Sequence, residues 1–226
     1  AHQEWERGTV QQLAIRQQLA AVVMEMAEAG RSTAGLPATA SEAQARTALA
    51  WDDAAWPWAK YGPVAMAAVR AGVPVLGGNL PRAQMRQAMQ DTRFDTHLPP
   101  AALQRQYEAL RTGHCGLLPE AQIAPMARIQ LARDASLART AEAALQPGKT
   151  LVLVAGLGHV QRSLGVPTWL PPHLEPKVAI AQAGQALPAI EKEADWIHHT
   201  PALPPQDPCA ELRKRFAPEK IQPHDR

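Results

Sequence analysis

The sequence has little of several features that mark particular classes of protein. Lys and Arg total 23 against 21 for Asp and Glu, which gives a formal net charge of +2 with the basic residues scattered along the chain. A chain without a basic patch lacks the electrostatic signature of a nucleic-acid-binding protein, so we expect no nucleic acid among its partners. No apolar run approaches the roughly 20 residues that a membrane-spanning helix requires.

Cysteines and nucleotide-binding motifs are scarce as well. Cys115 and Cys209 are the two cysteines, and they lie too far apart in the sequence for a structural zinc site, which needs close pairs. The glycine turn at Gly156 and Gly158 is followed by Gly165, which does not match the G-x-G-x-x-G spacing of a dinucleotide-binding fingerprint. The chain therefore shows neither a zinc-finger pattern nor a Rossmann signature.

What is present is a globular composition in which strands alternate with helices. Hydrophobic residues make up 46% of the 226 positions, enough for one α/β domain with a real core. Strand-like runs are expected at Ala20–Met26, Val73–Asn79, Leu151–Ala155, Lys177–Gly184 and Asp195–Thr200. Helices are expected at Glu4–Leu19, Glu42–Ala50 (capped by Ser41), Gly62–Gly72, from Pro81 onward, 99–113, 119–145 and Pro208–Phe216. The alternation predicts a single α/β domain over 1–226, with a mostly parallel sheet flanked by helices on both faces.

Three of the expected strands deliver a polar residue at or near their carboxyl ends. These residues are Glu25, Asn79 and His159. Because ligands bind at the carboxyl edge of a parallel sheet, the three side chains are predicted to share a crevice there. Each has a simpler interpretation too: Glu25 as an acid paired with a nearby arginine, Asn79 as turn chemistry and His159 as a helix cap.

Aromatic residues are only 4% of the chain, and four of them fall within eleven positions. The stretch "WDDAAWPWAKY" holds Trp51, Trp56, Trp58 and Tyr61. Large aromatic side chains commonly pin a loop onto the core, and at least two of the tryptophans fit that role. The functional interpretation is an aromatic wall for a flat apolar ligand, with Tyr61 offering a phenolate or a hydrogen bond.

A long predicted helix carries an unusual pair of polar residues on an otherwise core-like face. Met126, Gln130, Arg133 and Leu137 share one face at helical spacing. Arg133 either extends its charged end to water or points into the strand-edge crevice, where it would bind a carboxylate.

Taken together, the motifs resemble a known family. The segments "MEM", "WDDAAWPWAKYGPV", "AGVPVLGGNLPR", "HCGLLPE", "MARIQLARDASLA", "AGLGHVQRSLGVPTWL" and "DPCAELR" occur in this order. The chain thereby resembles the ChaN-like haem-binding uptake proteins of the Tiki superfamily over nearly its whole length. It is similar more distantly to TraB and erythromycin-esterase-like proteins.

The resemblance implies a haem-binding protein of iron uptake or haem trafficking rather than an enzyme, with non-covalent b-type haem as cofactor. Glu25, Asn79, Arg133 and His159 match family positions, and Tyr61 with Trp58 adds an aromatic contribution. Tyr61 is the first candidate for the iron ligand, with Tyr107 and His159 as rivals. The resemblance also implies a periplasmic or outer-membrane-anchored lipoprotein, and it suggests a homodimer and an outer-membrane haem receptor system as partners.

A second function follows from the more distant relatives. In a metal-dependent hydrolase, an esterase or protease, Glu25 and His159 would hold a divalent metal or activate water. Family members usually open with a strand that ends in a G-E-x-H-D-like motif, whereas this chain starts at "AHQEW" with Ala in place of Met. Because the first residue is Ala and the opening motif is missing, we expect a processed, truncated or partly observed chain that begins inside the domain. No signal peptide is apparent, and for such a chain this indicates nothing about the compartment.

The cysteines gain meaning from the same resemblance. Both lie next to Gly or Pro in expected loops, although two buried thiols acting as small hydrophobes remain an alternative. Because the family resemblance implies the periplasm, where disulfides persist, we predict a bond between Cys115 and Cys209.

Overall fold

The computed structural model describes residues 1–185, 188–202, 204, 207, 209–210 and 212–213. The strands are β1 (Leu19–Glu28), β2 (Val75–Asn79), β3 (Thr150–Val154), β4 (Ala179–Ala183) and β5 (Trp196–Thr200). The helices are α1 (His2–Ile15), α2 (Glu42–Ala48), α3 (Trp58–Arg70), α4 (Met85–Gln90), α5 (Pro100–Gly113), α6 (Glu120–Ala143), α7 (Leu157–Val160) and α8 (Pro188–Glu191). Three 3-10 turns are η1 (Arg82–Gln84), η2 (Thr92–Thr96) and η3 (Val166–Trp169). The helix expected over Pro208–Phe216 lies largely outside the described residues.

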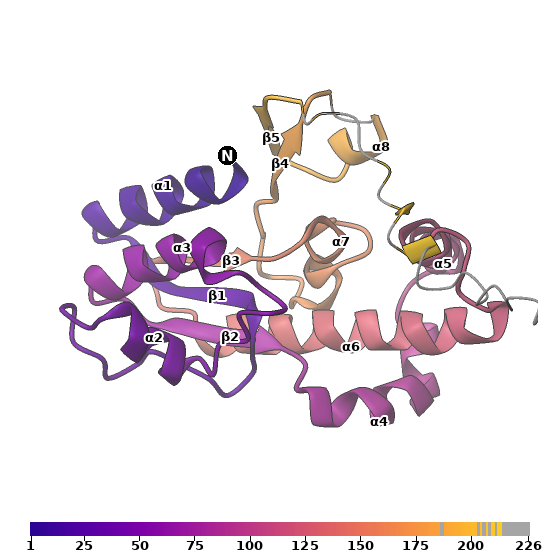
Figure 1. Cartoon of the computed structure of the whole chain (residues 1–226), viewed down its shortest axis with the longest axis horizontal. Helices are drawn as coiled ribbons and strands as arrows, with labels where there is room; N and C mark the ends of the chain where they lie inside the picture. Colours follow the sequence, from indigo (N-terminus) through magenta and orange to yellow (C-terminus); the bar gives the residue numbers. More distant parts are fainter. Residues whose placement is uncertain (186–187, 203, 205–206, 208, 211, 214–226) are drawn as a thin grey trace, which may run out of the picture.

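All strand pairs are parallel, as predicted, but the strands form two sheets. The first has the order β2-β1-β3, with Val22 opposite Val75 on one side and Val152 on the other. The second consists of β4 and β5. Within the described residues, the outer edge of β3 has no strand partner, so β4 and β5 stand apart from the larger sheet (Figure 1).

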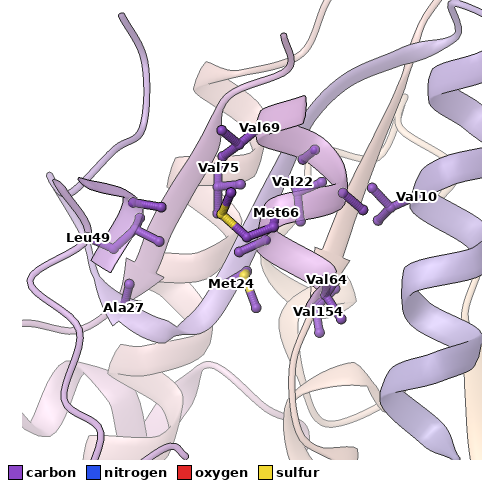
Figure 2. Close-up of a cluster of buried hydrophobic side chains, with 14 of the residues drawn as sticks. Val10, Val22, Met24, Ala27, Leu49, Val64, Met66, Val69, Val75 and Val154 are labelled. Carbon is purple, nitrogen blue, oxygen red and sulfur yellow. The ribbon is translucent and has the colours of Figure 1, made fainter. Parts of the chain in front are cut away.

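Helices cover both faces of the three-stranded sheet, as predicted. Val22 and Met24 of β1 point into a core shared with α1 and α3, which also contains Met66 and Val75 (Figure 2). Val23, on the opposite face, packs against α6. This alternation is the period of two that a strand requires, and it makes β1 the central strand, buried on both sides.

Local sequence explains where several helices differ from expectation. Ser41 caps α2 in a reciprocal capping box with Gln44, as predicted. Helix α1 ends at Ile15, short of Leu19, because Gln17 adopts a left-handed backbone with φ +58°. Helix α3 begins at Trp58, where the Asp53 carboxylate accepts the backbone N–H, so Pro63 lies inside the helix instead of in its first turn.

A disulfide joins Cys115, in the turn after α5, to Cys209, which confirms the predicted pairing. No helix in the described part of the chain is both long and apolar enough to cross a bilayer.

Candidate functional site

The three polar residues predicted to share a crevice do lie together at the carboxyl edge of the sheet. The Glu25 carboxylate lies 3.4 Å from Nε2 of His159. The Asn79 side-chain amide donates to the Glu25 backbone carbonyl at 2.9 Å. The predicted placement at one edge of the sheet is confirmed, but only Glu25 and Asn79 are among the residues that line the cleft described below, and His159 is buried behind Glu25. The roles of the three residues in ligand binding stay predictions.

Two contacts fix the path of the chain in the glycine-containing turn after β3. The backbone N–H of Gly156 donates to the Glu25 carboxylate at 2.7 Å, which ties the end of β3 to β1. Gly165 packs directly on the backbone of His159, since a Cβ there would lie 2.1 Å from the His159 carbonyl oxygen. Gly165 therefore lets the chain fold back tightly on His159 and hold the imidazole at the sheet edge.

Asp134 is a member of this cluster that the sequence interpretation missed. The Asp134 carboxylate lies 2.6 Å from Nδ1 of His159, and Asp134 as a whole is only 2% exposed to solvent. The sequence analysis selected the neighbouring Arg133 and not this acid, which lies between Arg133 and Ala135. An acid in the apolar run "LARDASLA" was the available signal, because a buried acid needs a partner.

Burial and pairing set the charges of this cluster. Burial raises the pKa of Asp134 to about 6, against the opposing hydrogen bond from His159. Burial alone would lower the pKa of His159, but the hydrogen bonds to Asp134 and Glu25 outweigh it and raise the pKa to about 10. Burial likewise opposes ionisation of Glu25, yet His159 and Gly156 hold its pKa below the usual value. At neutral pH a charged imidazole thus lies between two carboxylates.

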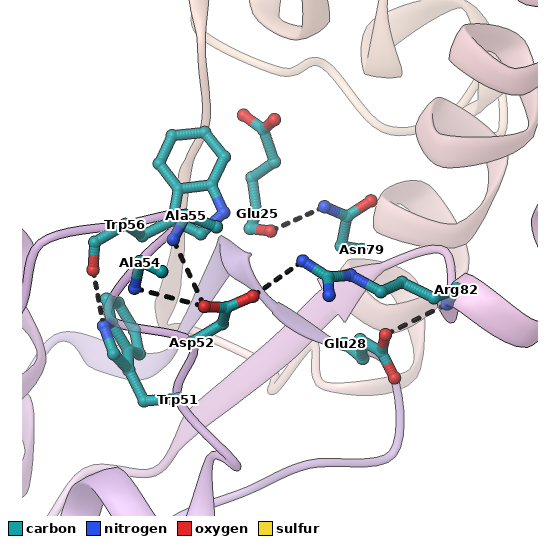
Figure 3. A network of polar contacts seen from close by, with 9 residues as sticks. All are labelled: Glu25, Glu28, Trp51, Asp52, Ala54, Ala55, Trp56, Asn79 and Arg82. Atoms are coloured by element: carbon teal, nitrogen blue, oxygen red, sulfur yellow. Dashed lines mark hydrogen bonds and ion pairs between the residues drawn. The ribbon is translucent and has the colours of Figure 1, made fainter.

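A cleft of about 360 Å³ opens beside this cluster. Among the residues that line it are Glu25, Asn79, Arg133, Arg31, Arg82 and Trp56. Figure 3 shows part of its polar wall, where the Arg82 guanidinium donates to Asp52 at 2.6 Å and the Arg82 backbone N–H donates to Glu28 at 3.0 Å. Nε of Arg133 and Oδ1 of Asn79 are buried there with no hydrogen-bond partner in the described structure.

The aromatic cluster divides into a core part and a part beside the cleft. Trp58 is 7% exposed, packs edge-on against Trp51 and donates its indole N–H to Glu42, so the structure places it in the core and not on a ligand-facing wall. Trp56 lines the cleft and packs edge-on against Tyr61, with ring centroids 5.5 Å apart.

The two tyrosines occupy different parts of the molecule. Tyr61, on α3, lies close enough to Glu6 and Glu25 for their charges to add to burial in raising the pKa of its phenol. Tyr107 packs between α5 and α6 against Leu110 and Ile123, among the apolar side chains of a separate cluster. Tyr61 is thus the tyrosine beside the strand-edge cluster.

A larger groove of about 920 Å³ runs along the free edge of β3. Apolar side chains from β3, α1 and the segment before β4 line much of it, including Leu13, Val152 and Val178. None of its described lining residues is His, Tyr, Cys or Met. The groove is roomy and apolar, but it offers none of the side chains that usually ligate haem iron.

The described residues contain no group of three or more His, Cys, Asp or Glu side chains arranged to hold a metal ion. Glu25 and His159 supply two potential ligands, whereas catalytic zinc sites use three protein ligands. Asp134 would orient His159 in such a site, as carboxylates do for metal-bound imidazoles.

Comparison with known proteins places the chain in a family. The family model described as haem-binding uptake, Tiki superfamily, ChaN matches residues 1–170. The chain belongs to the ChaN family. The predicted resemblance is confirmed by this match. No curated protein matches the chain.

A solved structure supports the same fold. The chain is similar to the structure titled "Cofacial heme binding to ChaN of Campylobacter jejuni", with a TM-score of 0.64 and 16% sequence identity. The match covers 87% of this chain and 81% of that chain. At this level of identity the likeness shows the ChaN fold, and it confirms the predicted α/β class.

Proposed function

We propose that this ChaN-family chain binds haem as a step in haem or iron uptake. Haem needs an axial iron ligand, an apolar surface for the macrocycle and cations for its two propionates. The observation that carries the proposal is the position of Trp56, which contacts Tyr61 on one side and lines the arginine-bearing cleft on the other. One porphyrin edge could thus reach the cleft while the iron meets the phenol.

The geometry favours Tyr61 over His159 as the axial ligand. Nδ1 of His159 faces Asp134 at 2.6 Å and Nε2 faces Glu25 at 3.4 Å, so neither nitrogen is free to bind iron. Tyr61 makes no hydrogen bond through its phenol within the described structure, and a tyrosinate ligand suits ferric haem. In this proposal His159 acts as a positioning residue that holds Glu25 at the cleft.

Haem titration followed by absorbance tests the assignment of the ligand. Tyr61→Phe keeps the ring and removes the phenol, so we expect loss of the tyrosinate–ferric spectrum and at least a tenfold weaker affinity. Tyr107→Phe is the matched control and should titrate like the wild type, because Tyr107 lies in a separate apolar cluster. An unchanged spectrum and affinity in Tyr61→Phe would rule out Tyr61 and move the test to His159→Gln.

We further propose that the haem complex is a homodimer. The cleft volume of about 360 Å³ is near the lower end of the range for small-molecule binding sites. The cleft would therefore hold one edge of the porphyrin and leave much of the macrocycle uncovered. The related ChaN of Campylobacter jejuni binds haem cofacially, an arrangement in which a second copy could cover the exposed face. Light scattering with and without haem checks this, with a haem-dependent doubling of mass as the expected result.

We place the protein in the periplasm or at the outer membrane, handing haem to or from an outer-membrane receptor system. Support comes from the Cys115–Cys209 disulfide, since such bonds persist in oxidising compartments, and from membership of an uptake family. Fractionation of cells that express the complete gene product, with acyl-chain labelling for a lipoprotein anchor, tests both statements.

For the domain organisation, we propose that residues 1–226 form one ChaN-like domain. Support comes from the family model, which matches residues 1–170, and from the related structure, whose match covers 87% of the chain. Thermal unfolding tests this, with one cooperative transition as the expected result and two separate transitions as the result that would contradict it.

A metal-dependent hydrolase remains a second candidate because of one observation. Asp134 binds Nδ1 of His159, which leaves Nε2 directed at Glu25 as in a metal site that lacks its remaining ligands. Metal analysis of the purified protein, beside the Glu25→Gln variant, separates the two functions. Stoichiometric divalent metal that is lost in Glu25→Gln would favour the hydrolase.

A further inference from the structure

Two side-chain contacts fasten the second sheet to α1. Nε2 of His2 lies 3.0 Å from Oγ1 of Thr200, and Trp5 stacks on His198 with ring centroids 4.8 Å and planes 5° apart. His2 and Trp5 share one face of α1 at a spacing of three residues, and His198 and Thr200 share one face of β5 at a spacing of two. Figure 1 shows the start of α1 beside β4 and β5. We call this pair of contacts the α1–β5 joint.

The joint stands beside the apolar groove along β3. Helix α1 lines this groove from Trp5 to Arg16, and Trp196 lines it from β5, two positions before His198 and on the same face of the strand. In the described part of the chain, β4 and β5 pair with each other and with no other strand. The joint therefore helps to set how closely the β4–β5 sheet approaches α1 across the groove.

The joint contains two imidazoles and no acid to balance them. Burial, the α-amino group of Ala1 and the imidazole of His198 each lower the pKa of His2 below its usual value of 6.5. Among the described residues, the contacts between an imidazole and a carboxylate are those of His159, far from this joint in the sequence. The joint is therefore built for the neutral form of His2, whose charge would meet the charge of His198 from the other element.

The other titratable groups of these elements have their own surroundings. On α1, Glu4 pairs with Arg7, and Glu6 is partly buried with one carboxylate oxygen that has no hydrogen-bond partner in the described structure. On β5, His199 lies on the opposite face of the strand, where its Nδ1 is 3.1 Å from the carbonyl oxygen of Gly184. Strand β4 carries no titratable side chain. Protonation of His2 and His198 thus adds charge to the joint that no acid there offsets.

We propose that the α1–β5 joint is a pH-sensitive contact that loosens in mild acid, when its two imidazoles carry like charges side by side. Like charges repel most strongly where water is partly excluded. The direction follows from His2: a joint that lowers its pKa has full strength above pH 6.5 and weakens as pH falls through the lower, folded-state value. The β4–β5 sheet then moves away from α1 at the groove. The inference does not depend on haem binding.

The two contacts of the joint respond differently to protonation. Oγ1 of Thr200 donates to the Gln182 carbonyl at 3.4 Å, so it accepts from Nε2 of His2, and a neutral imidazole with its proton on Nε2 suffices for that bond. A charged His198 would still attract the face of the Trp5 indole. The loosening therefore depends on the charge of His2 opposite His198, and removing that charge alone should abolish it.

Hydrogen exchange followed by mass spectrometry tests the joint in the whole chain. Protection of residues 6–10 and 196–200 is compared at pH 7.5 and pH 5.0, after correction for the intrinsic pH dependence of exchange. Because one unit of pKa shift corresponds to a factor of ten, we expect protection to fall about three- to tenfold at pH 5.0. An NMR titration of the imidazoles should give His2 a midpoint below 6.5.

Three variants separate charge from contact. His2→Gln keeps an N–H donor for Thr200 and cannot become charged, so its protection should be the same at both pH values. His198→Phe keeps a ring against Trp5 and removes the second charge, so its loss of protection in acid should be smaller than that of the wild type. His199→Gln, on the opposite face of β5, is the matched control and should respond to acid like the wild type.

Each possible result supports or overturns the proposal. Equal protection of the wild type at both pH values overturns it, as does a full acid response in His2→Gln. If His2→Gln weakens the joint at both pH values, His198→Phe decides, and a full acid response in that variant overturns the proposal. Acetylation of the Ala1 amino group removes the third charge near His2. A response that persists after acetylation supports the imidazoles, and a response that disappears assigns the effect to the α-amino group and overturns the proposal.

Discussion

The Asp134 carboxylate lies 2.6 Å from Nδ1 of His159, with both side chains buried at the carboxyl edge of the sheet. This contact joins α6 to the turn after β3, and through Nε2 of His159 it extends to Glu25 on β1. Three elements that are distant in sequence are therefore fastened together beside the cleft. The cluster fixes the orientation of Glu25 from two directions, since Gly156 binds its second oxygen.

Removing the Asp134 carboxylate should strongly destabilise the protein. Asp134→Ala leaves a protonated imidazole in a buried place without its nearest counter-charge, and breaking such a pair costs about 3–5 kcal/mol. Urea denaturation followed by circular dichroism measures the loss. Glu142→Ala, at an exposed position of the same helix, is the matched control and should change stability by less than about 0.5 kcal/mol. Equal stabilities for the two variants would contradict a buried ion pair.

Gly165 should tolerate no side chain, whereas Gly158 in the same segment should tolerate one. An alanine Cβ at position 165 would lie 2.1 Å from the carbonyl oxygen of His159, so the backbone must shift at a cost of about 1–3 kcal/mol. At position 158 no atom lies within 4 Å of the added Cβ, and alanine is the better helix former. Thermal unfolding of both variants checks this, and a Gly165→Ala protein as stable as Gly158→Ala would refute the close packing.

Much of this architecture could be predicted because local patterns decide it. Apolar runs and their spacing located β1, β2 and β3, and parallel pairing then brought Glu25, Asn79 and His159 to one edge. Capping chemistry located the start of α2 at Ser41. These features depend on residues close together in the sequence, or on a general rule for parallel sheets.

The structural features that could not be predicted from the sequence depend on contacts between distant segments. Asp134 is a site residue only because His159 approaches it across 25 positions. The acid in "LARDASLA" indicates that a partner is needed, but nothing near it in sequence indicates which residue that partner is. The clustering of aromatic residues predicts that Trp58 contributes to a ligand wall, but its indole N–H donates to Glu42 and the ring packs in the core. The separation of β4 and β5 from the larger sheet is likewise invisible to apolar periodicity, which detects strands but not their partners.

Stability in acid should depend on Glu193, which joins α8 and β5 to the turn before Gly165. Burial opposes its ionisation, but hydrogen bonds from Ser163 and the contact with Arg105 outweigh that effect and hold the pKa below the usual 4.5. Because the folded-state pKa is the lower one, the stabilisation is present above about pH 4.5 and is lost as pH falls through the folded-state value.

The Glu193→Gln variant tests this dependence. At pH 7 it should be less stable than the wild type by about 1–3 kcal/mol, since it loses charge-assisted hydrogen bonds to a buried group. The difference should shrink as pH falls below 4.5, when the wild-type carboxyl also becomes neutral. Glu191→Gln, at an exposed position of α8, should follow the wild type throughout. A difference that stays constant from pH 7 to pH 3 would show that Glu193 acts by packing and not by charge.

The disulfide should provide a large share of the stability of the oxidised protein. Cys115 and Cys209 are 94 positions apart, and closing a loop of about this length stabilises a fold by roughly 4–5 kcal/mol in the chain-entropy model. The Cys115→Ser/Cys209→Ser double variant should lose about that amount in urea denaturation, and reductant should destabilise the wild type equally while leaving the variant unchanged. Alkylation and intact mass under denaturing, non-reducing conditions provide the direct check. Two free thiols in protein from an oxidising compartment would contradict the bond and would also remove the structural support for export.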